Sequence, residues 1–421
     1  MTAYSSGLAV SVVIPTHNPR MDYLARVLEA LRAQTLPREQ WEIIVVDNGS
    51  RVSLKAGAGQ QDNRSAGPQD CGTSLPSHIP TFPPSTAHLD LGWHPNARVV
   101  REEELGLTFA RLRGFAEAKG YLIVMVDDDN LLAPDYLETA VRIAQEHPGL
   151  GAFGGKCLPE FETEPGPWLE ARGKGLGLRD RGEREEFFPE AAICEASVSV
   201  GQCFGRAVEK PELLKNRNTE LPENRVTRRV TEFPDCAPIG AGMVLRRDAA
   251  LAYAERLRRR SGLRVAGGES DGVSAAQAEQ SPNHRSTETP NHRAASVITD
   301  RRGDSLASGG DNDICLTVIE EGWQVGYLPH LQLIHLIPKQ RMTLDYHRRM
   351  ARDSMKSFVL MLDQHGIRPW PAMPRWTLPL RVAGDWWRVK PWQGPEQSLH
   401  FWGHVGMYEG RAALPQQGTR R

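Results

Sequence analysis

The sequence YLIVMVDDDNLLAP, from Tyr121 to Pro134, decides how this chain folds. Its apolar run Leu122–Val126 predicts a buried β-strand, because short apolar runs of this kind form the inner strands of α/β sheets. The strand leads directly into Asp127, Asp128 and Asp129. Three adjacent carboxylates repel one another and are costly to remove from water, so their place at a strand end needs a physical reason.

A divalent cation removes this conflict. Mg²⁺ or Mn²⁺ accepts one or two carboxylates as ligands and keeps its other positions for water and substrate phosphate. Ligands of open α/β sheets bind beyond the carboxyl ends of the strands, where this acidic cluster lies. We therefore interpret the cluster as a metal–phosphate site. The alternative is a solvated acidic turn that stabilises the N-terminus of a helix beginning near Pro134.

The composition excludes several classes of protein. The chain has 421 residues, a formal net charge of −1 and a hydrophobic fraction of 40%. This length allows more than one domain, and the near-neutral charge argues against nucleic-acid binding driven by bulk charge. No apolar run approaches the ~20 residues of a membrane-spanning helix, and we recognise no secretory signal. The six cysteines form no CxxC pair, so we expect reduced thiols in a cytosolic protein.

The order of the expected elements indicates a mostly parallel sheet. Two apolar, β-branched runs at residues 9–14 and 41–46 flank a segment with helical spacing. A strand, a helix and a strand in this order form a βαβ unit, whose strands pair in parallel. Further strands are expected at 97–101, 149–155, 239–246, 323–328 and 331–337, and helices at 106–119, 134–147, 248–259, 314–322 and 343–365.

Two polar stretches, at about 51–93 and 261–305, show no periodicity, and we expect both to be low-complexity insertions. The second repeats PNHR at Pro282 and Pro290, and we expect its histidines to be solvated. The tail from residue 341 predicts a helix and then a Trp- and Pro-rich end. We interpret the tail tryptophans as packing against the rest of the protein, and contact with a membrane surface is the alternative.

Taken together, the segments resemble the inverting glycosyltransferases of family 2. The matching segments are VSVVIPTHN, IIVVDNGS, ELGLTFARLRGF, VMVDDDNLLAPDYL, GAGMVLRR, GGDNDICL and LIHL. The resemblance implies an α/β fold of the GT-A type, with a Rossmann-like, mostly parallel sheet flanked by helices. The resemblance covers the core of roughly residues 8–340, and the two insertions and the tail lie outside it. We expect a catalytic domain over residues 1–340, which carries both insertions, and a C-terminal helical, Trp-rich extension over residues 341–421.

The resemblance also implies which residues bind the donor nucleotide. Asp47 stands where an acidic side chain accepts a hydrogen bond from the base, and a simple turn residue is the alternative. Arg111 matches the Arg of a helix motif in the family, although Leu112 replaces the usual Asn. The first loop supplies further nucleotide contacts: Pro15, Thr16, His17 and Asn18.

The metal site follows from the same resemblance. Asp127 and Asp129 match the DxD motif of the family, with Asp129 as the expected direct ligand. Asp127 is the second candidate ligand, and either Asp127 or Asp128 reaches the ribose. His335 matches a histidine that completes the metal site in some members. A satisfied core histidine is the alternative for this position.

Asp311 matches the general base of the family, although Gly310 replaces the usual Glu. The transfer of a sugar from a nucleotide diphosphate needs both a metal and a base. A metal stabilises the charge that grows on a leaving diphosphate, and a carboxylate takes the proton of the attacking hydroxyl. The alternative for Asp311 is an N-cap of the following helix, and Asp313 is a second candidate for either role.

These residues predict a metal-dependent, inverting glycosyltransferase that uses Mn²⁺ or Mg²⁺. It would move one sugar from a nucleotide-diphosphate sugar, with a UDP-sugar favoured, to a hydroxyl of a saccharide or lipid-linked acceptor. We expect no nucleic-acid partner and a cytoplasmic location, with the cytoplasmic membrane face as the alternative. Acceptor specificity is expected in residues 156–310. The rival functions are a sugar nucleotidyltransferase and a non-catalytic nucleotide-sugar- or saccharide-binding protein.

Overall fold

The computed structural model describes residues 7–57, 86–170, 176–189, 230–261, 306 and 309–415. The insertion expected at 261–305 therefore lies outside the described residues, apart from Ser261. Three of the cysteines are described, and each is a buried free thiol: Cys157, Cys236 and Cys315. Among the described residues, no helix has the length and apolar character needed to span a bilayer.

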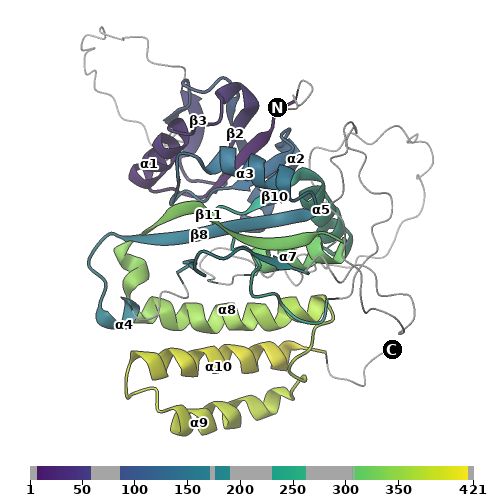
Figure 1. The fold of residues 1–421 in the computed structure, drawn as a ribbon. Helices are drawn as coiled ribbons and strands as arrows, with labels where there is room; N and C mark the ends of the chain where they lie inside the picture. The colour runs from purple at the N-terminus through teal and green to yellow at the C-terminus, as the bar shows by residue number, and fades with distance from the viewer. Residues whose placement is uncertain are drawn as a thin grey trace, which may run out of the picture.

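Within the described residues, nine strands form the central sheet (Figure 1). Its first half is parallel. Strand β1 (Val10–Thr16) lies between β2 (Trp41–Asn48) and β6 (Leu122–Met125), and β5 (Ala97–Glu102) pairs with β2. Every residue of β1, β2 and β6 is buried, as the apolar runs predicted.

The second half of the sheet is mixed. Strand β10 (Val244–Arg246) is antiparallel to both β6 and β8 (Leu150–Phe161). Strand β8 pairs in parallel with β11 (Gln324–Ile337), and β11 also carries antiparallel β7 (Asn130–Leu132) and β9 (Glu186–Phe188). Most paired residues of the sheet belong to parallel ladders, so the prediction of a mostly parallel sheet is confirmed.

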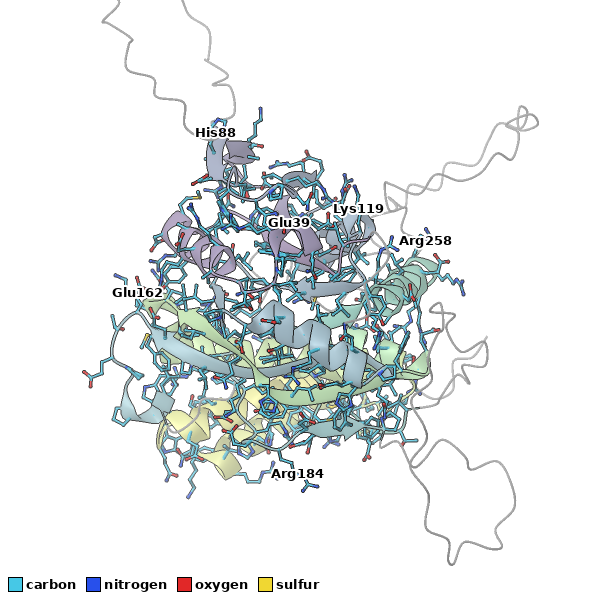
Figure 2. The ribbon with its side chains drawn as sticks, turned by 45° about the horizontal axis from the view of Figure 1, so that its top comes forward. Glu39, His88, Lys119, Glu162, Arg184 and Arg258 are labelled. Atoms are coloured by element: carbon cyan, nitrogen blue, oxygen red, sulfur yellow. The ribbon has the colours of Figure 1, made fainter. Side chains whose placement is uncertain are left out.

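Helices cover both faces of the sheet because successive strand residues point to opposite sides. Helices α1 (Met21–Arg32) and α3 (Tyr136–Glu146) pack on one face, against side chains such as Val12 and Val124. The other face packs against three helices: α2 (Leu107–Glu117), α5 (Arg247–Ser261) and α7 (Gly310–Glu320). In Figure 2 the side chains fill the space between these layers, and the labelled Glu162, His88, Arg184 and Arg258 lie at the periphery.

The C-terminal extension is helical, as predicted. Helices α8 (Leu344–Gln364), α10 (Pro395–Ala413) and α9 (Leu378–Val389) stack in that order below the sheet, and α9 is the outermost layer (Figure 1). Helices α8 and α10 cross closely, because a Cβ atom at Gly406 would lie only 2.0 Å from the carbonyl oxygen of Arg352. Three short helical segments are α4 (Pro167–Glu170), η3 (Lys339–Met342) and η4 (Arg375–Thr377).

Three expectations from the sequence differ from the structure. The stretch 51–93 is not without secondary structure, because β3 (Ser53–Gly57) and β4 (Thr86–Asp90) pair in parallel and bury Leu54 and Leu89 in the core. The runs expected at 323–328 and 331–337 form one long strand, β11, with a register shift between Tyr327 and Gln332. Of the strand expected at 239–246, only β10 forms, and the residues before it line the site described next.

The tail tryptophans also differ from the main expectation. Trp370 packs against the core, but Trp376, Trp386, Trp387 and Trp392 are exposed. The interpretation as packing against the rest of the protein is therefore wrong for Trp376, Trp387 and Trp392. Trp386 still packs edge-on against Phe401 of α10, with ring centroids 5.3 Å apart.

Candidate active site

A cavity of about 940 Å³ opens beyond the carboxyl ends of β1 and β6. This is the place where open α/β sheets bind ligands. The structure brings most of the predicted site residues together there. Those that line the cavity are Pro15, Thr16, His17, Asn18, Arg111, Asp127, Asp128, Asp129, Asp311 and His335. Asp47 is not among the lining residues. The roles given to these residues stay predictions.

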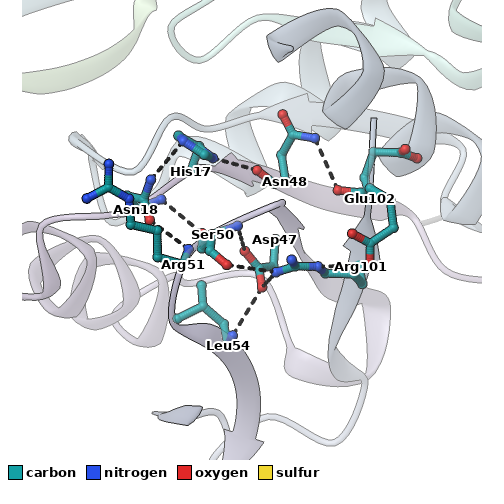
Figure 3. Close-up of polar contacts among 10 residues, drawn as sticks. His17, Asn18, Asp47, Asn48, Ser50, Arg51, Leu54, Arg101 and Glu102 are labelled. Atoms are coloured by element: carbon teal, nitrogen blue, oxygen red, sulfur yellow. Dashed lines mark hydrogen bonds and ion pairs between the residues drawn. The ribbon is translucent and has the colours of Figure 1, made fainter. Parts of the chain in front are cut away.

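The first loop is held in place by the loop that follows β2 (Figure 3). His17 Nδ1 donates to the carbonyl oxygen of Asn48 at 2.6 Å, and His17 Nε2 accepts from the Asn18 amide at 2.7 Å. The backbone N–H of Asn18 donates to Ser50 Oγ, and the side-chain oxygen of Asn18 accepts from the backbone N–H of Arg51. These bonds fix the loop at the mouth of the cavity, so His17 is part of a built structure rather than a loose turn.

Asp47 holds the same loops together from below (Figure 3). Its buried carboxylate accepts hydrogen bonds from the backbone N–H groups of Ser50 at 3.2 Å and Leu54 at 3.1 Å, and from Arg101 at 2.6 Å. Burial alone would raise the pKa of Asp47, but these hydrogen bonds outweigh it and hold the pKa below its usual value. The predicted contact with a nucleotide base therefore has no support here, and the neighbouring Asn48 lines the cavity instead.

The acidic cluster continues β6 and turns into β7. Asp128 accepts a hydrogen bond from Thr16 Oγ1 at 2.5 Å across the β1–β6 pair. Burial, together with the charges of Asp129 and Asp127, raises the pKa of Asp128 to about 7. The conflict among adjacent carboxylates that the sequence indicated is therefore real in the folded protein.

The pairing of β7 with β11 places His335 beside the acidic cluster. Asn130 is the register partner of His335, and the N–H of Leu336 donates to the carbonyl oxygen of Asp129 at 2.8 Å. As a result, His335 Nε2 lies 3.3 Å from Asp129 Oδ2. Two residues more than 200 positions apart in the sequence thus meet because two strands share a ladder.

Arg341 was not predicted from the sequence. It comes from η3, and its guanidinium donates to Asp129 Oδ2 at 2.9 Å and lies 3.3 Å from His335 Nε2. This cation partly neutralises the acidic cluster. The only sequence signal was the segment KQR, two residues after the LIHL segment, which no strand or helix pattern connected with the aspartates.

The residues present fit a divalent metal that keeps water and phosphate ligands. No group of three or more His, Cys, Asp or Glu side chains converges on one point among the described residues. Asp129 and His335 nevertheless converge from two elements, and Mg²⁺ or Mn²⁺ needs only one or two protein ligands when a substrate phosphate supplies others. Asp129 and His335 are the residues that would hold such an ion.

The structure separates Asp311 from Asp313. Asp311 lies in the first turn of α7 and lines the cavity, and its Oδ2 accepts the N–H of Gly240 at 3.0 Å. The N-cap of α7 is Gly309, without a side-chain capping bond, so the N-cap alternative for Asp311 is wrong. Asp313 points into the core, where it contacts His365 and Arg260 at 2.7 and 3.1 Å.

Gly240 lies close to two of the lining side chains, Arg111 and Asp311. A Cβ atom at this position would lie 2.7 Å from Arg111 Nη2 and 3.6 Å from the Cβ of Asp311. A side chain at this position would push the Arg111 guanidinium aside, and it would be in ordinary contact with Asp311. The Gly-rich approach to β10, which the sequence suggested as a strand, is therefore a wall of the cavity.

Helix α8 forms a wall of the cavity that the sequence did not predict. Its lining residues are Tyr346, His347, Met350, Ala351 and Ser354, and α10 adds Leu399. The predicted domain boundary at residue 340 stays a prediction, but the cavity crosses it. From the range 156–310, where acceptor specificity was expected, fewer described side chains reach the cavity, among them Leu176 and Ile239.

Comparison with known proteins gives a family match. Residues 11–62 and 86–200 match the family described as Glycosyl transferase family 2. The chain is 32% identical over 88 residues to the glucosyl-dolichyl phosphate glucuronosyltransferase of Haloferax volcanii, which covers 19% of this chain and 26% of the relative. It is 28% identical over 142 residues to the putative glycosyltransferase EpsH of Bacillus subtilis, over 34% of this chain and 32% of the relative. The chain thus spans about a third or less of the length of these relatives.

Solved structures with a similar arrangement include the mannosyltransferase PcManGT from Pyrobaculum calidifontis in complex with GDP-Man and Mn²⁺. That structure shares 15% identity, with a TM-score of 0.39, over 97% of this chain and 74% of that chain. S. aureus TarS 1–349 shares 11% identity, with a TM-score of 0.34, over 96% of this chain and 89% of that chain.

Proposed function

We propose that the chain is a member of glycosyl transferase family 2, whose model matches residues 11–62 and 86–200, and that it transfers a single sugar from a nucleotide-diphosphate sugar to a hydroxyl of a saccharide or lipid-linked acceptor. One observation carries the proposal. The acidic cluster after β6 and Asp311 of α7 line the same cavity, although they are far apart in the sequence.

The donor side of the cavity lies at the ends of β1 and β6. The loop Pro15–Asn18 is fixed by hydrogen bonds and is available to contact the nucleotide. Arg341 lies beside Asp129 and offers a positive charge to the diphosphate. A divalent ion held by Asp129 and His335 would supply further stabilisation of the charge that develops on the leaving diphosphate.

The acceptor side lies between α7 and α8. Asp311 takes the proton of the attacking hydroxyl as general base. The N–H of Gly240 fixes one oxygen of its carboxylate, which keeps the side chain directed at the cavity. A hydroxyl activated by a base across the sugar from the leaving diphosphate displaces it in a single step, and this inverts the anomeric carbon. The residues of α8 face the space that the acceptor would fill.

The test combines donors, metals and a pair of variants. The purified protein is incubated with UDP- and GDP-sugars, UDP-sugars first, with Mn²⁺ or Mg²⁺ and with saccharide or lipid-linked acceptors, and released nucleoside diphosphate is measured. Asp311→Asn preserves the shape of the side chain and is expected to lower the rate by about 10²- to 10⁴-fold. Asp345→Asn, on an exposed side chain of α8, is the matched control and keeps the wild-type rate.

Three results would contradict the proposal. The first is equal turnover by the wild type and Asp311→Asn. The second is pyrophosphate release from a nucleoside triphosphate, which would favour a sugar nucleotidyltransferase. The third is tight binding of a nucleotide sugar without turnover for any acceptor, which would favour a non-catalytic binding protein. Asp129→Asn tests the metal separately, because it should weaken binding of Mn²⁺ measured by calorimetry without sugar or acceptor present.

A further inference from the structure

The outer face of α9 and its flanking residues carries an unusual concentration of exposed aromatic side chains. Among the described residues, ten large hydrophobic side chains are exposed, and five of them lie between residues 376 and 392. Trp376 and Trp387 are each 72% exposed, Leu380 is 67% exposed and Trp392 is 53% exposed. Single exposed apolar residues are ordinary, but a cluster of this density marks a surface that is covered by something else.

Two of these residues lie on one side of α9, because Leu380 and Trp387 are seven residues apart on the helix. Trp376 lies in η4 just before the helix, and Trp392 lies three residues after its end at Val389. We call this group of residues, made of Trp376, Leu380, Trp387 and Trp392, the tryptophan stripe.

The opposite side of α9 is firmly attached to the protein. Leu378 and Val382 pack against the cluster formed by Met373, Tyr408 and Ala412. Asp385 is buried and accepts a hydrogen bond from the hydroxyl of Tyr408 at 2.7 Å. The exposure of the tryptophan stripe therefore does not come from a helix that has separated from its core.

Basic side chains surround the tryptophan stripe. Arg375, Arg381, Arg388 and Lys390 are all exposed, and the single acidic residue of the segment, Asp385, points inward. Arg388 reaches back to pair with Asp385, and the other three cations remain at the surface. The surface that covers the stripe must therefore be apolar within and negatively charged at its edge.

We propose that α9 docks the protein on the surface of a bilayer that contains anionic lipids. Tryptophan prefers the boundary between headgroups and acyl chains, because its ring is apolar and its N–H remains close to water. Arginine and lysine at the same depth contact lipid phosphates. In this proposal α9 lies in the plane of the interface, with its exposed aromatic side chains toward the acyl chains.

A second copy of the chain fits this face less well. A twofold dimer would bring each patch against its own copy, so that Arg381 and Lys390 of both chains would meet like charges. Helix α9 is the outermost helix of the C-terminal stack (Figure 1), and the side chains of the tryptophan stripe are exposed. The docking proposal does not rest on the proposed sugar transfer, because it concerns binding alone.

The experiment is flotation of the full chain with vesicles of phosphatidylcholine, with and without phosphatidylglycerol. The wild type is expected to float with the anionic vesicles and to be released at high salt. The variant Trp376→Ser/Trp387→Ser should reduce the partition coefficient at least tenfold, and Arg381→Glu/Lys390→Glu should abolish the preference for anionic lipid. Met21→Ser and Arg259→Glu are controls, because they change an exposed apolar and an exposed basic residue far from α9.

Two outcomes would overturn the proposal. One is flotation that is equal for the wild type and the double Trp variant. The other is a wild type that stays with the soluble fraction but sediments as a dimer that the Trp substitutions dissociate, which would assign the stripe to a second copy. Circular dichroism of each variant shows whether the fold is kept, and α9 is expected to keep it because the substituted side chains face solvent.

Discussion

His365 connects the C-terminal extension to the helix that carries Asp311. It caps α8, and its side chain is fully buried. Its Nε2 lies 2.7 Å from Asp313 Oδ1 and its Nδ1 lies 3.0 Å from Glu320 Oε1. A neutral imidazole has only one N–H, so both contacts are satisfied only by the charged, doubly protonated ring. Burial lowers the pKa of His365, but the two carboxylates outweigh it and raise the pKa above 6.5.

The perturbation that tests this reasoning is His365→Leu. It removes two hydrogen bonds between charged groups, each worth about 1.5–3 kcal/mol. Arg260 still pairs with Asp313, and Arg256 still pairs with Glu320, so the carboxylates are not left alone. We therefore expect the lower end of the range, a loss of about 3 kcal/mol in the free energy of unfolding at a pH of about 6.

The sign of the pH dependence follows from the raised pKa. The stabilisation by His365 is fully present below its unfolded pKa of about 6.5 and is lost as the pH rises through the higher folded pKa. The gap in unfolding free energy between wild type and His365→Leu is therefore largest near pH ~6 and narrows toward pH ~9. Urea unfolding followed by circular dichroism across this range measures it.

His330→Leu is the control for this series, because His330 is 62% exposed and has no close partner of this kind. Its unfolding free energy should run parallel to that of the wild type at every pH. A gap for His365→Leu that stays constant, or that widens as the pH rises, would refute a charged His365 in the folded protein.

Three further outcomes concern stability and are measured by urea unfolding. Burial lowers the pKa of His94 to about 4, so the folded protein should lose about 3 kcal/mol of unfolding free energy as the pH falls from ~6.5 toward 4. The variant His94→Phe has no group to protonate at this position and should not show this loss. Asp47→Ala leaves two backbone N–H groups and Arg101 without their acceptor, and it should lower the free energy of unfolding by about 3 kcal/mol. If Asp47 served only to bind the nucleotide, the urea midpoint of the free protein would not change. Gly406→Ala should cost about 1–3 kcal/mol because its Cβ would clash with the carbonyl oxygen of Arg352, and Gly403→Ala on the same helix, with open space around it, should cost nothing.

The sequence predicted the parts of the fold that depend on local pattern. The apolar runs of β1, β2 and β6 became buried parallel strands, and their polar ends formed one cavity. Asp129 and Asp311 were placed there by the rule that ligands bind at the carboxyl ends of strands and by the family resemblance. The strands needed only the period of the hydrophobic pattern and the order of the elements, and the site residues also needed the family resemblance.

The rest depends on contacts between distant segments, which periodicity does not encode. Asp47 pairs with Arg101, its register partner on β5, and does not line the cavity; register is a property of the folded sheet. Arg341 meets Asp129 only after η3 has folded back over the acidic cluster. The short strands β3 and β4 lack a pattern of their own and are held by burial of Leu54 and Leu89.

Because α8 forms one wall of the cavity, changes in this helix can alter which molecules the cavity binds. The lining loops that we propose to face the nucleotide come from the beginning of the chain, and the opposing wall comes from a helix near its end. Under the proposed function, exchange of that helix for one from a related protein would change the molecule that is recognised and leave Asp129 and Asp311 in place. Selection could then alter the acceptor without altering the reaction.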